Sequence, residues 1–204
     1  AIAVARNNGK KRGSINLDQY SNVANPGAHE KITGPQLLDQ LGESLGLICA
    51  GLGTTGTLLG TATYLRRHLP NVKVAAVVRT PNNSVPGVRT RNGLREVGFA
   101  WEDVITEPLV DVDEQSSYKT SIALVRMGLL VGPSSGFAYE GLMRHLKRME
   151  KTGEIESLRD MHVVFICPYS VFPYIDDYAR VLGESYFPAI KNAHLRERNH
   201  TGNY

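Results

Sequence analysis

A glycine-rich segment, residues 51–57, lies between an apolar run and an amphipathic run and reads Gly-Leu-Gly-Thr-Thr-Gly-Thr. Residues 47–50 before it have the apolar character of a buried parallel strand, and leucines recur at helical spacing after it. This order predicts a strand, a tight turn and a helix. Glycines let the backbone approach an anion, and the first amides of a helix have no internal acceptor. We interpret the segment as a phosphate cradle, with an ordinary βα turn as the alternative.

Two further apolar runs, residues 72–78 and 163–167, alternate with helical patterns along the chain. This alternation predicts an α/β fold, in which a twisted, mostly parallel sheet carries helices on both faces and forms three layers. Ligands of such sheets bind beyond the carboxyl ends of the strands. We therefore expect the turns at residues 51–57, 132–136 and 168–170 to converge on one crevice.

Local signals give finer expectations between the strands. Residues 19–35 are rich in turn formers and predict a structured loop, followed by a helix over residues 36–45. Residues 101–105 and 109–112 are candidate short strands. Asp113 is expected to cap a helix that stops at Gly128, and a last helix is expected over residues 174–182.

The composition is that of an ordinary soluble protein with one core. The 204 residues are 42% hydrophobic and 21% charged, and the net charge of +3 is too small to argue for nucleic acid. No apolar run has the ~18 residues that a membrane span needs, and the first residues lack the layout of a signal peptide. The two cysteines, Cys49 and Cys167, both lie in apolar runs, so we expect buried, reduced thiols and a cytoplasmic location.

The same glycines also permit a different ligand. Gly51, Gly53 and Gly56 satisfy the dinucleotide fingerprint, and Arg79 lies at the end of the next strand, where a partner for a 2′-phosphate is expected. No acidic residue for a ribose follows that strand. An NADP-binding oxidoreductase domain is therefore a second hypothesis.

Four stretches that keep their order resemble the cysteine synthase and cystathionine β-synthase family of pyridoxal-phosphate enzymes, the fold type II group. Residues 19–26 (QYSNVANP), followed by His29-Glu30 and by Thr-Gly-Pro at 33–35, resemble the segment that leads into its large domain. Residues 53–57 resemble its phosphate loop, with Thr55 where many members have glycine. Residues 128–136 (GLLVGPSSG) resemble its glycine-serine turn, and residues 168–170 resemble the turn whose serine meets the pyridine nitrogen.

The resemblance implies pyridoxal 5′-phosphate as cofactor and assigns roles to several residues. The phosphate would be held by Gly53, Thr54, Thr55, Gly56 and Thr57. Ser170 would meet the ring nitrogen, where a neutral hydroxyl suits β-elimination chemistry, and Gln19 would help to hold the substrate carboxylate. As alternatives, Ser170 caps the following helix and Gln19 is a loop amide. Ser134 and Ser135 are expected to cap the helix after Gly136 rather than to touch substrate.

The sequence also departs from that family. Its Schiff-base lysine belongs to an N-terminal segment that has no counterpart here, and none of the eight lysines aligns with a catalytic position; its asparagine-bearing substrate loop is missing too. The chain therefore resembles the later part of such an enzyme. We expect residues 1–20 to be a remnant of the small N-terminal domain, residues 21–188 to form the large phosphate-binding domain, and residues 189–204 to be a loose basic tail.

The expected function is that of the C-terminal part of a β-replacement enzyme, which makes cysteine or a related amino acid from an activated serine and is inactive as this chain alone. Such a part should expose an apolar sheet edge or face, and its partner would be a second copy or a complementing N-terminal segment. Neither nucleic acid nor membrane is expected as a partner. The alternatives are a non-catalytic fragment or degenerate homologue that binds a phosphate-bearing ligand, and the NADP-binding domain.

Overall fold

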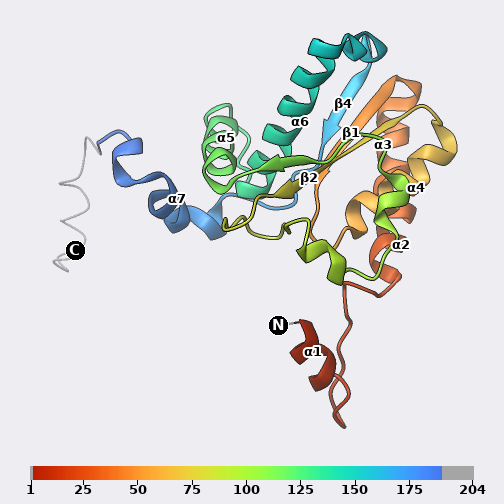
Figure 1. Cartoon of the computed structure of the whole chain (residues 1–204), viewed down its shortest axis with the longest axis vertical. Coiled ribbons are helices and arrows are strands. Elements are labelled where there is room, and N and C mark those ends of the chain that lie inside the picture. Colours follow the sequence, from red (N-terminus) through yellow and green to blue (C-terminus); the bar gives the residue numbers. More distant parts are fainter. Residues whose placement is uncertain (1, 190–204) are drawn as a thin grey trace, which may run out of the picture.

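A computed structural model describes residues 2–189 of the chain, so almost all of the expected basic tail lies outside the described residues. Figure 1 shows a central sheet between two groups of helices, with one helix set apart at the N-terminal end. The strands are β1 (Leu45–Gly51), β2 (Lys73–Arg79), β3 (Val110–Val112) and β4 (His162–Phe165). The α-helices are α1 (Ile2–Asn8), α2 (Ala24–Lys31), α3 (Thr33–Leu41), α4 (Gly56–His68), α5 (Glu114–Arg126), α6 (Pro133–Thr152) and α7 (Ile175–Leu182).

The sheet has the strand order β3-β2-β1-β4, and all three pairings are parallel. Its central strand β1 is buried from Leu45 to Ala50, as its continuous apolar sequence predicts. Strand β2 is buried from Val74 to Val78 for the same reason. Because parallel strands need crossover connections, helices separate the strands along the chain and cover the sheet. The predicted α/β class with a parallel sheet is confirmed.

Alternate residues of the central strands pack into two separate cores. Ile48 and Val74 face the core shared with α3 and α4, whereas Leu47 and Val77 face the core shared with α6. All four side chains are fully buried. The side chains of a strand alternate between its faces, so one short apolar run supplies both cores. Helices α2, α3 and α4 cover one face and α5 and α6 the other, which gives the three layers (Figure 1).

Residues 19–35 are not the loop that the turn formers predicted, because residues 24–31 form α2. The Asn22 side chain accepts a hydrogen bond from the Ala24 amide at 3.0 Å, and Pro26 lies in the first turn, where a helix tolerates proline. Helix α2 packs closely on α4, since a Cβ placed at Gly60 would lie 2.0 Å from the Pro26 carbonyl oxygen. Tertiary packing therefore makes a helix of a segment whose composition indicates turns.

Other boundaries also differ from the expectations. Helix α3 spans Thr33–Leu41 rather than residues 36–45, and residues 101–104 form a 3-10 helix rather than a strand. The expected strand at residues 109–112 is present as β3, and the expected last helix is α7. Asp113 does cap α5, because its carboxylate accepts the Ser116 amide at 2.8 Å.

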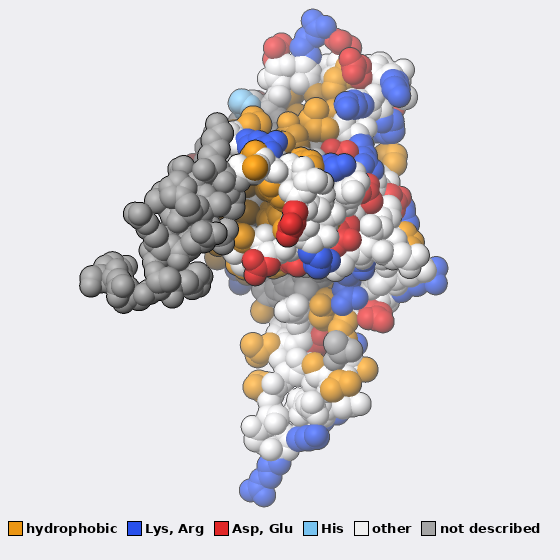
Figure 2. Space-filling model, turned by 90° about the vertical axis from the view of Figure 1, so that its left-hand side faces the viewer, with side chains coloured by type: hydrophobic (Ala, Val, Ile, Leu, Met, Phe, Trp, Pro, Cys, Tyr) orange, Lys and Arg blue, Asp and Glu red, His pale blue; other side chains and the backbone are white. Residues whose placement is uncertain are grey.

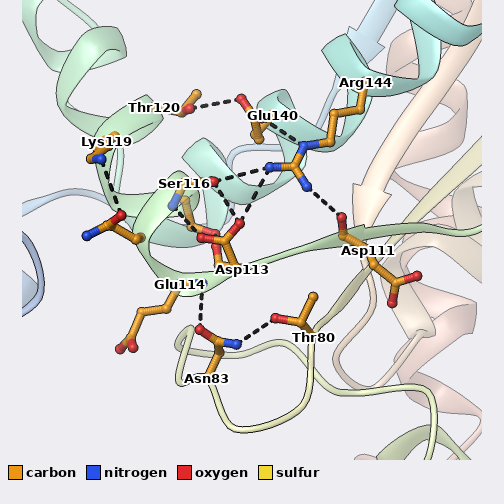
Figure 3. A network of polar contacts seen from close by, with 12 residues as sticks. Thr80, Asn83, Asp111, Asp113, Glu114, Ser116, Lys119, Thr120, Glu140 and Arg144 are labelled. Atoms are coloured by element: carbon orange, nitrogen blue, oxygen red, sulfur yellow. Dashed lines mark hydrogen bonds and ion pairs between the residues drawn. The ribbon is translucent and has the colours of Figure 1, made fainter.

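Arg144 of α6 joins β3 and the start of α5 to the helical layer (Figure 3). Its guanidinium donates to the Asp111 carbonyl oxygen at 2.9 Å, pairs with Glu140 at 2.8 Å and lies 3.5 Å from Asp113. These charged side chains are partly exposed, so their ion pairs add little to stability. Their main effect is to fix the positions of the elements that they join. The contacts hold β3 in register at one edge of the sheet.

Asn83 extends the same network to the loop that follows β2 (Figure 3). Its side-chain oxygen accepts the Glu114 amide at 3.2 Å, and its nitrogen donates to the Thr80 hydroxyl at 2.6 Å. The loop is thereby attached to the start of α5. This attachment matters for function, because residues further along the loop line the cavity described below.

The two cysteines differ, although both were expected to be buried. Cys49 lies in β1 with no exposed surface, and its burial raises the pKa of the thiol to about 12. Cys167 is exposed, which corrects the expectation for that residue. Strand β4 ends at Phe165 and lies at an edge of the sheet, so the chain leaves the covered region before Cys167.

The N-terminal part of the chain projects from the body (Figure 1). We call residues 2–17 the arm; within it α1 has no buried residue. Figure 2 shows hydrophobic side chains on the projecting part of the surface. They include Val4, Ile15 and Leu17, which are all exposed. Among the described helices none has both the length and the hydropathy of a bilayer span.

Candidate functional site

A cavity of about 310 Å³ opens at the carboxyl ends of β1 and β4. Its walls come from the turn after β1, the loop after β2, the start of α6 and the segment that leaves β4. The three turns that were expected to converge all reach it, since Thr54, Ser134 and Pro168 are among its lining residues. A cavity of this size is at the lower end of the range for small-molecule sites.

The structure brings most of the residues of the expected phosphate loop to this cavity. Its lining includes Gly53, Thr54, Thr55 and Thr57. The expected loop residue Gly56 is not among the lining residues, because it lies behind the loop against α2. Two other candidates also lie outside the lining: Ser170, and Gln19, which lines a separate hollow of about 270 Å³ at the base of the arm.

The turn after β1 is held against the loop after β2 by backbone contacts. The Leu52 amide donates to the Val77 carbonyl oxygen at 2.9 Å, and the Arg89 amide donates to the Leu52 carbonyl oxygen at 2.8 Å. A Cβ at Gly53 would lie 2.0 Å from the Gly87 carbonyl oxygen. Only glycine therefore lets the two segments approach this closely, and together they form one rim of the cavity.

Thr55 occupies a backbone conformation that favours glycine. Its φ is +70° and its ψ −13°, in the left-handed region, where a β-branched residue is strained. The residue is 3% exposed, and its hydroxyl oxygen is buried without a hydrogen-bond partner. Strain and an unpaired hydroxyl at one position of a cavity wall are typical of a functional site.

Asn25 of α2 supports the loop from behind and was not singled out by the sequence. Its side-chain nitrogen donates to the Thr54 hydroxyl at 3.1 Å and to the Gln19 carbonyl oxygen at 2.7 Å. A Cβ at Gly56 would lie 2.2 Å from the Asn25 side-chain oxygen. The glycine therefore leaves room for the amide group. The signal for Asn25 was its place in the segment 19–26 that resembled the family, where no role was assigned to it.

His29 is a second site residue without a predicted role. Its Nε2 lies 3.1 Å from the Thr57 hydroxyl, its Nδ1 lies 2.9 Å from the Thr33 hydroxyl, and its ring lines the cavity. Burial lowers the pKa of this imidazole below its usual value. The neutral ring has one donor and one acceptor nitrogen, so it can fix the direction of the Thr57 hydroxyl proton.

The first turn of α4 leaves amide groups available at the cavity. The Leu59 amide donates to the Thr55 carbonyl oxygen at 2.9 Å, which is the first helical bond of this turn. The Gly56 amide reaches only the Thr54 hydroxyl, at 3.4 Å. The amides of Thr57 and Leu58 belong to the turn that has no internal acceptors. Together with the helix dipole, they make this end of the cavity suited to an anion.

Ser134 and Ser135 do not cap α6, contrary to the expectation. The N-cap residue is Gly132, no side chain caps the helix, and both serine hydroxyls are buried without a partner. They lie inside the first turn because Pro133 occupies the first helical position. Ser134 is among the residues that line the cavity, although its hydroxyl has almost no exposed surface.

Ser170 lies at the same end of the sheet as the expected phosphate loop, because it follows β4, which runs parallel to β1. It is exposed and pairs with Val131 in an isolated antiparallel bridge. Neither of the two helices that follow it, residues 172–174 and α7, has a side-chain cap, so the alternative helix-cap role is wrong. A role at a ring nitrogen stays a prediction, as does the substrate role of Gln19.

The residues present fit a phosphorylated ligand of the size of pyridoxal phosphate. The cavity has an open helix start and a glycine turn at one end, and the unpaired hydroxyls of Thr55 and Ser134 in its walls. Hydroxyl groups and backbone amides are the donors that such a phosphate needs. Within residues 2–189 no lysine lines the cavity.

Comparison with known proteins places the chain in a family. Residues 1–167 match the family described as "Pyridoxal-phosphate dependent enzyme". Cysteine synthase B of Pseudomonas aeruginosa is 30% identical over 140 residues, which are 68% of this chain and 46% of that protein. A cysteine synthase of Staphylococcus aureus is 31% identical over 160 residues, 74% of this chain and 51% of that protein.

Solved structures show the same fold. An O-ureido-L-serine synthase variant with bound O-ureido-L-serine gives a TM-score of 0.70 at 24% identity. The match covers 98% of this chain and 61% of the synthase chain. An O-acetylserine-dependent cystathionine β-synthase from Helicobacter pylori gives a TM-score of 0.68 at 23% identity. That match covers 84% of this chain and 55% of the synthase chain. The chain thus spans about half the length of the curated relatives that it matches.

The match with this family decides between the two cofactors that the glycines allowed. Gly51, Gly53 and Gly56 alone permit a dinucleotide, but the family match extends over most of the chain. Arg79, the expected partner of a 2′-phosphate, is not among the residues that line the cavity. The comparisons therefore speak against an NADP-binding oxidoreductase. The chain belongs to the family of pyridoxal-phosphate-dependent enzymes.

Proposed function

We propose that this chain is the phosphate-holding part of a cytoplasmic β-replacement enzyme of the cysteine synthase type, acting on an activated serine. The observation that carries the proposal is the cavity in which the open start of α4 lies together with the unpaired hydroxyls of Thr55 and Ser134. When bound, pyridoxal phosphate supplies an electron-withdrawing ring for elimination at the β-carbon of an amino acid.

In this proposal each part of the cavity holds a different part of the ligand. Gly53, Thr54, Thr55, Gly56 and Thr57 form the phosphate end, and His29 directs the Thr57 hydroxyl toward the anion. Ser134 contributes a hydroxyl at the side of the cavity formed by α6. Ser170 approaches the ring nitrogen, and Gln19 holds the substrate carboxylate. The last two roles require both side chains to move, since neither lines the cavity in this structure.

We further propose that the lysine of the reaction lies outside this chain and that the chain alone does not turn over substrate. A second copy or an N-terminal segment would complete the site. Strand β4 supports this part of the proposal, because it pairs only with β1 among the described strands and its apolar residues Val163 and Phe165 are only half-buried. An apolar edge strand of this kind favours pairing with a further strand.

Titration of the purified chain with three ligands tests the cofactor assignment. Pyridoxal phosphate should bind with a change in its absorbance, pyridoxal should bind at least tenfold more weakly because it lacks the phosphate, and NADPH should not compete. Equal affinity for pyridoxal and pyridoxal phosphate would contradict the phosphate cradle. Displacement of the cofactor by NADPH would instead favour the dinucleotide hypothesis.

A second experiment distinguishes an enzyme part from a non-catalytic binding protein. Sulfide-dependent consumption of O-acetylserine is measured with the chain alone and after co-expression with the N-terminal half of a cysteine synthase. We expect no turnover alone and turnover after complementation. Turnover by the chain alone would show that the lysine assignment is wrong, and a complex that binds cofactor without turnover would favour the non-catalytic alternative.

A further inference from the structure

Two helices, α4 and α6, begin at the cavity. Both place residues of their first turn in its lining: Thr57 for α4 and Ser134 for α6. Each helix is longer than three turns, so each start offers free amides and the positive end of a dipole to an anion. A ligand with one phosphate group could therefore bind in two opposite orientations unless the two starts differ.

The hydrogen bonds show that the start of α6 is closed. Pro133 at its first position has no amide hydrogen, and the amides of Ser135 and Gly136 both donate to the Gly132 carbonyl oxygen, at 3.0 and 3.3 Å. The remaining amide, that of Ser134, donates to the hydroxyl oxygen of Tyr169 at 3.2 Å. No amide of this turn is left for a ligand, whereas those of Thr57 and Leu58 in α4 are.

Tyr169 connects this helix start to the opposite rim of the cavity. Its hydroxyl donates to the Pro86 carbonyl oxygen at 3.1 Å, and so it accepts from Ser134. Pro86 precedes Gly87, which lines the cavity. Burial raises the pKa of the Tyr169 hydroxyl to about 12, so the proton that it donates stays in place at neutral pH. The hydroxyl thus joins two walls that come from distant parts of the sequence.

The ring of Tyr169 is also held from two sides. A Cβ at Gly132 would lie 2.3 Å from its Cε2 atom, and the ring centroid lies 4.8 Å from that of Tyr174. Because Gly132 has no side chain, the Tyr169 ring can lie against the start of α6. A ring fixed in this way places its hydroxyl at the helix start without a large entropy cost.

We propose that Tyr169 is a positioning residue that sets the orientation of the ligand in the cavity. By taking up the Ser134 amide it closes α6 to anions, which leaves the start of α4 for the phosphate. The same bond fixes the first turn of α6, and with it the Ser134 side chain, whose buried hydroxyl would meet the other end of the ligand. This inference rests on the proposed function, since it assigns the two ends of the same cavity.

Tyr178 provides a matched control for the loss of a buried tyrosine hydroxyl. Its hydroxyl lies 2.6 Å from that of Ser121, the residue is 4% exposed, and it does not line the cavity. Tyr178→Phe should therefore destabilise the chain to a similar extent as Tyr169→Phe but leave ligand binding as it is. Thermal unfolding of the unliganded variants measures whether the two losses are comparable.

The experiment compares wild type, Tyr169→Phe and Tyr178→Phe with two probes, pyridoxal phosphate and inorganic phosphate, the latter measured by competition. In Tyr169→Phe we expect about tenfold weaker binding of pyridoxal phosphate and a reduced circular dichroism of the bound ligand. The dissociation constant of inorganic phosphate should stay unchanged. Tyr178→Phe should match wild type in all three. An unchanged affinity and dichroism in Tyr169→Phe, or equal losses for both probes, would overturn the proposal.

Ser134→Ala decides the question if Tyr169→Phe does not fold. It keeps the contacts of Tyr169 and removes only the hydroxyl that Tyr169 directs, so the dichroism of bound pyridoxal phosphate should fall while inorganic phosphate binds as before. A dichroism equal to that of wild type would overturn the proposal. If wild type itself binds no pyridoxal phosphate, the proposed function fails, and this inference fails with it.

Discussion

Strand β1 and the N-terminal arm both carry apolar side chains, but these have opposite surroundings. Leu47 and Ile48 of β1 have no exposed surface, whereas Ile15 and Leu17 of the arm are 82% and 71% exposed. The sheet has helices on both faces, and the arm has only a few polar contacts such as the ion pair between Arg6 and Asp18. Apolar burial therefore stabilises the body and the walls of its cavity, whereas the arm adds little to the stability of this chain.

Among changes in the residues of the site, the largest effect should come at its closest backbone approach, in the body of the chain. Gly53→Val would place side-chain atoms where the Gly87 carbonyl oxygen lies, so the two rims of the cavity would separate. We expect loss of pyridoxal-phosphate binding and a fall of about 3 kcal/mol in the free energy of unfolding, measured by calorimetry and urea denaturation. Gly27→Ala, at a position in α2 with open space, is the control and should change neither.

Gly56→Asp should have the next largest effect, on binding more than on stability. The carboxylate would lie at a helix start suited to anions, and the side chain would also displace Asn25. Binding of pyridoxal phosphate should fall at least a hundredfold. Gly56→Ala separates the two causes, because it introduces the steric conflict without charge. Equal affinities for the two variants would mean that the charge has no role.

Thr55→Gly should have the opposite effect on stability, which it should raise. Glycine adopts the left-handed conformation without strain, and the change removes a buried hydroxyl without a partner. We expect the unliganded chain to gain about 1 kcal/mol in unfolding free energy while pyridoxal phosphate binds more weakly. Loss of stability in this variant would show that the Thr55 side chain supports the fold rather than the ligand.

His29 gives a smaller effect that depends on pH. Burial lowers its pKa in the folded chain, so the unfolded chain binds a proton more readily as the pH falls below the usual histidine pKa of about 6.5. The stabilisation from the neutral ring is therefore complete above that pH and decreases below it. In His29→Asn the unfolding free energy should vary less between pH 7 and pH 5 than in wild type. An identical pH dependence would contradict a buried, neutral His29.

The smallest effect is expected in the arm. Leu17→Ser should change the unfolding free energy of the isolated chain by less than about 0.5 kcal/mol, because the side chain is largely exposed. The equivalent change in the body, Leu47→Ser, should prevent folding. A loss of more than 1 kcal/mol in Leu17→Ser would show that the arm packs on another surface in solution, and light scattering would then reveal whether that surface belongs to a second copy.

Much of the fold could be predicted from the sequence, because the signals are local. The apolar composition of the run from Leu45 to Gly51 indicates a buried strand. The carboxylate of Asp113 indicates a helix start, because it can accept a hydrogen bond from a first-turn amide. Residues 24–31 could not be assigned in this way. Asparagine, proline and glycine favour turns there, and the helix depends on contacts with distant residues such as Gly60 of α4.

The site was predictable in part. Glycines after a buried strand, together with the family resemblance, pointed to residues 53–57 as a ligand-binding loop, and Thr54 and Thr57 do line the cavity. Asn25 and His29 were not assigned roles, since nothing in their neighbourhood in the sequence shows that α2 lies behind that loop. For Ser134 the sequence favoured a helix cap, and the structure places Gly132 in that position.

The class of the fold, the central strands and the glycine turn follow from the order of residues, because hydrophobic pattern and backbone freedom are properties of neighbouring residues. Which polar groups meet depends instead on how the elements pack. Tyr169 follows β4 and reaches both Pro86, in the loop after β2, and Ser134, in the first turn of α6. Their distance in space depends on the order β3-β2-β1-β4, which results from packing both faces of the sheet and which no single segment encodes.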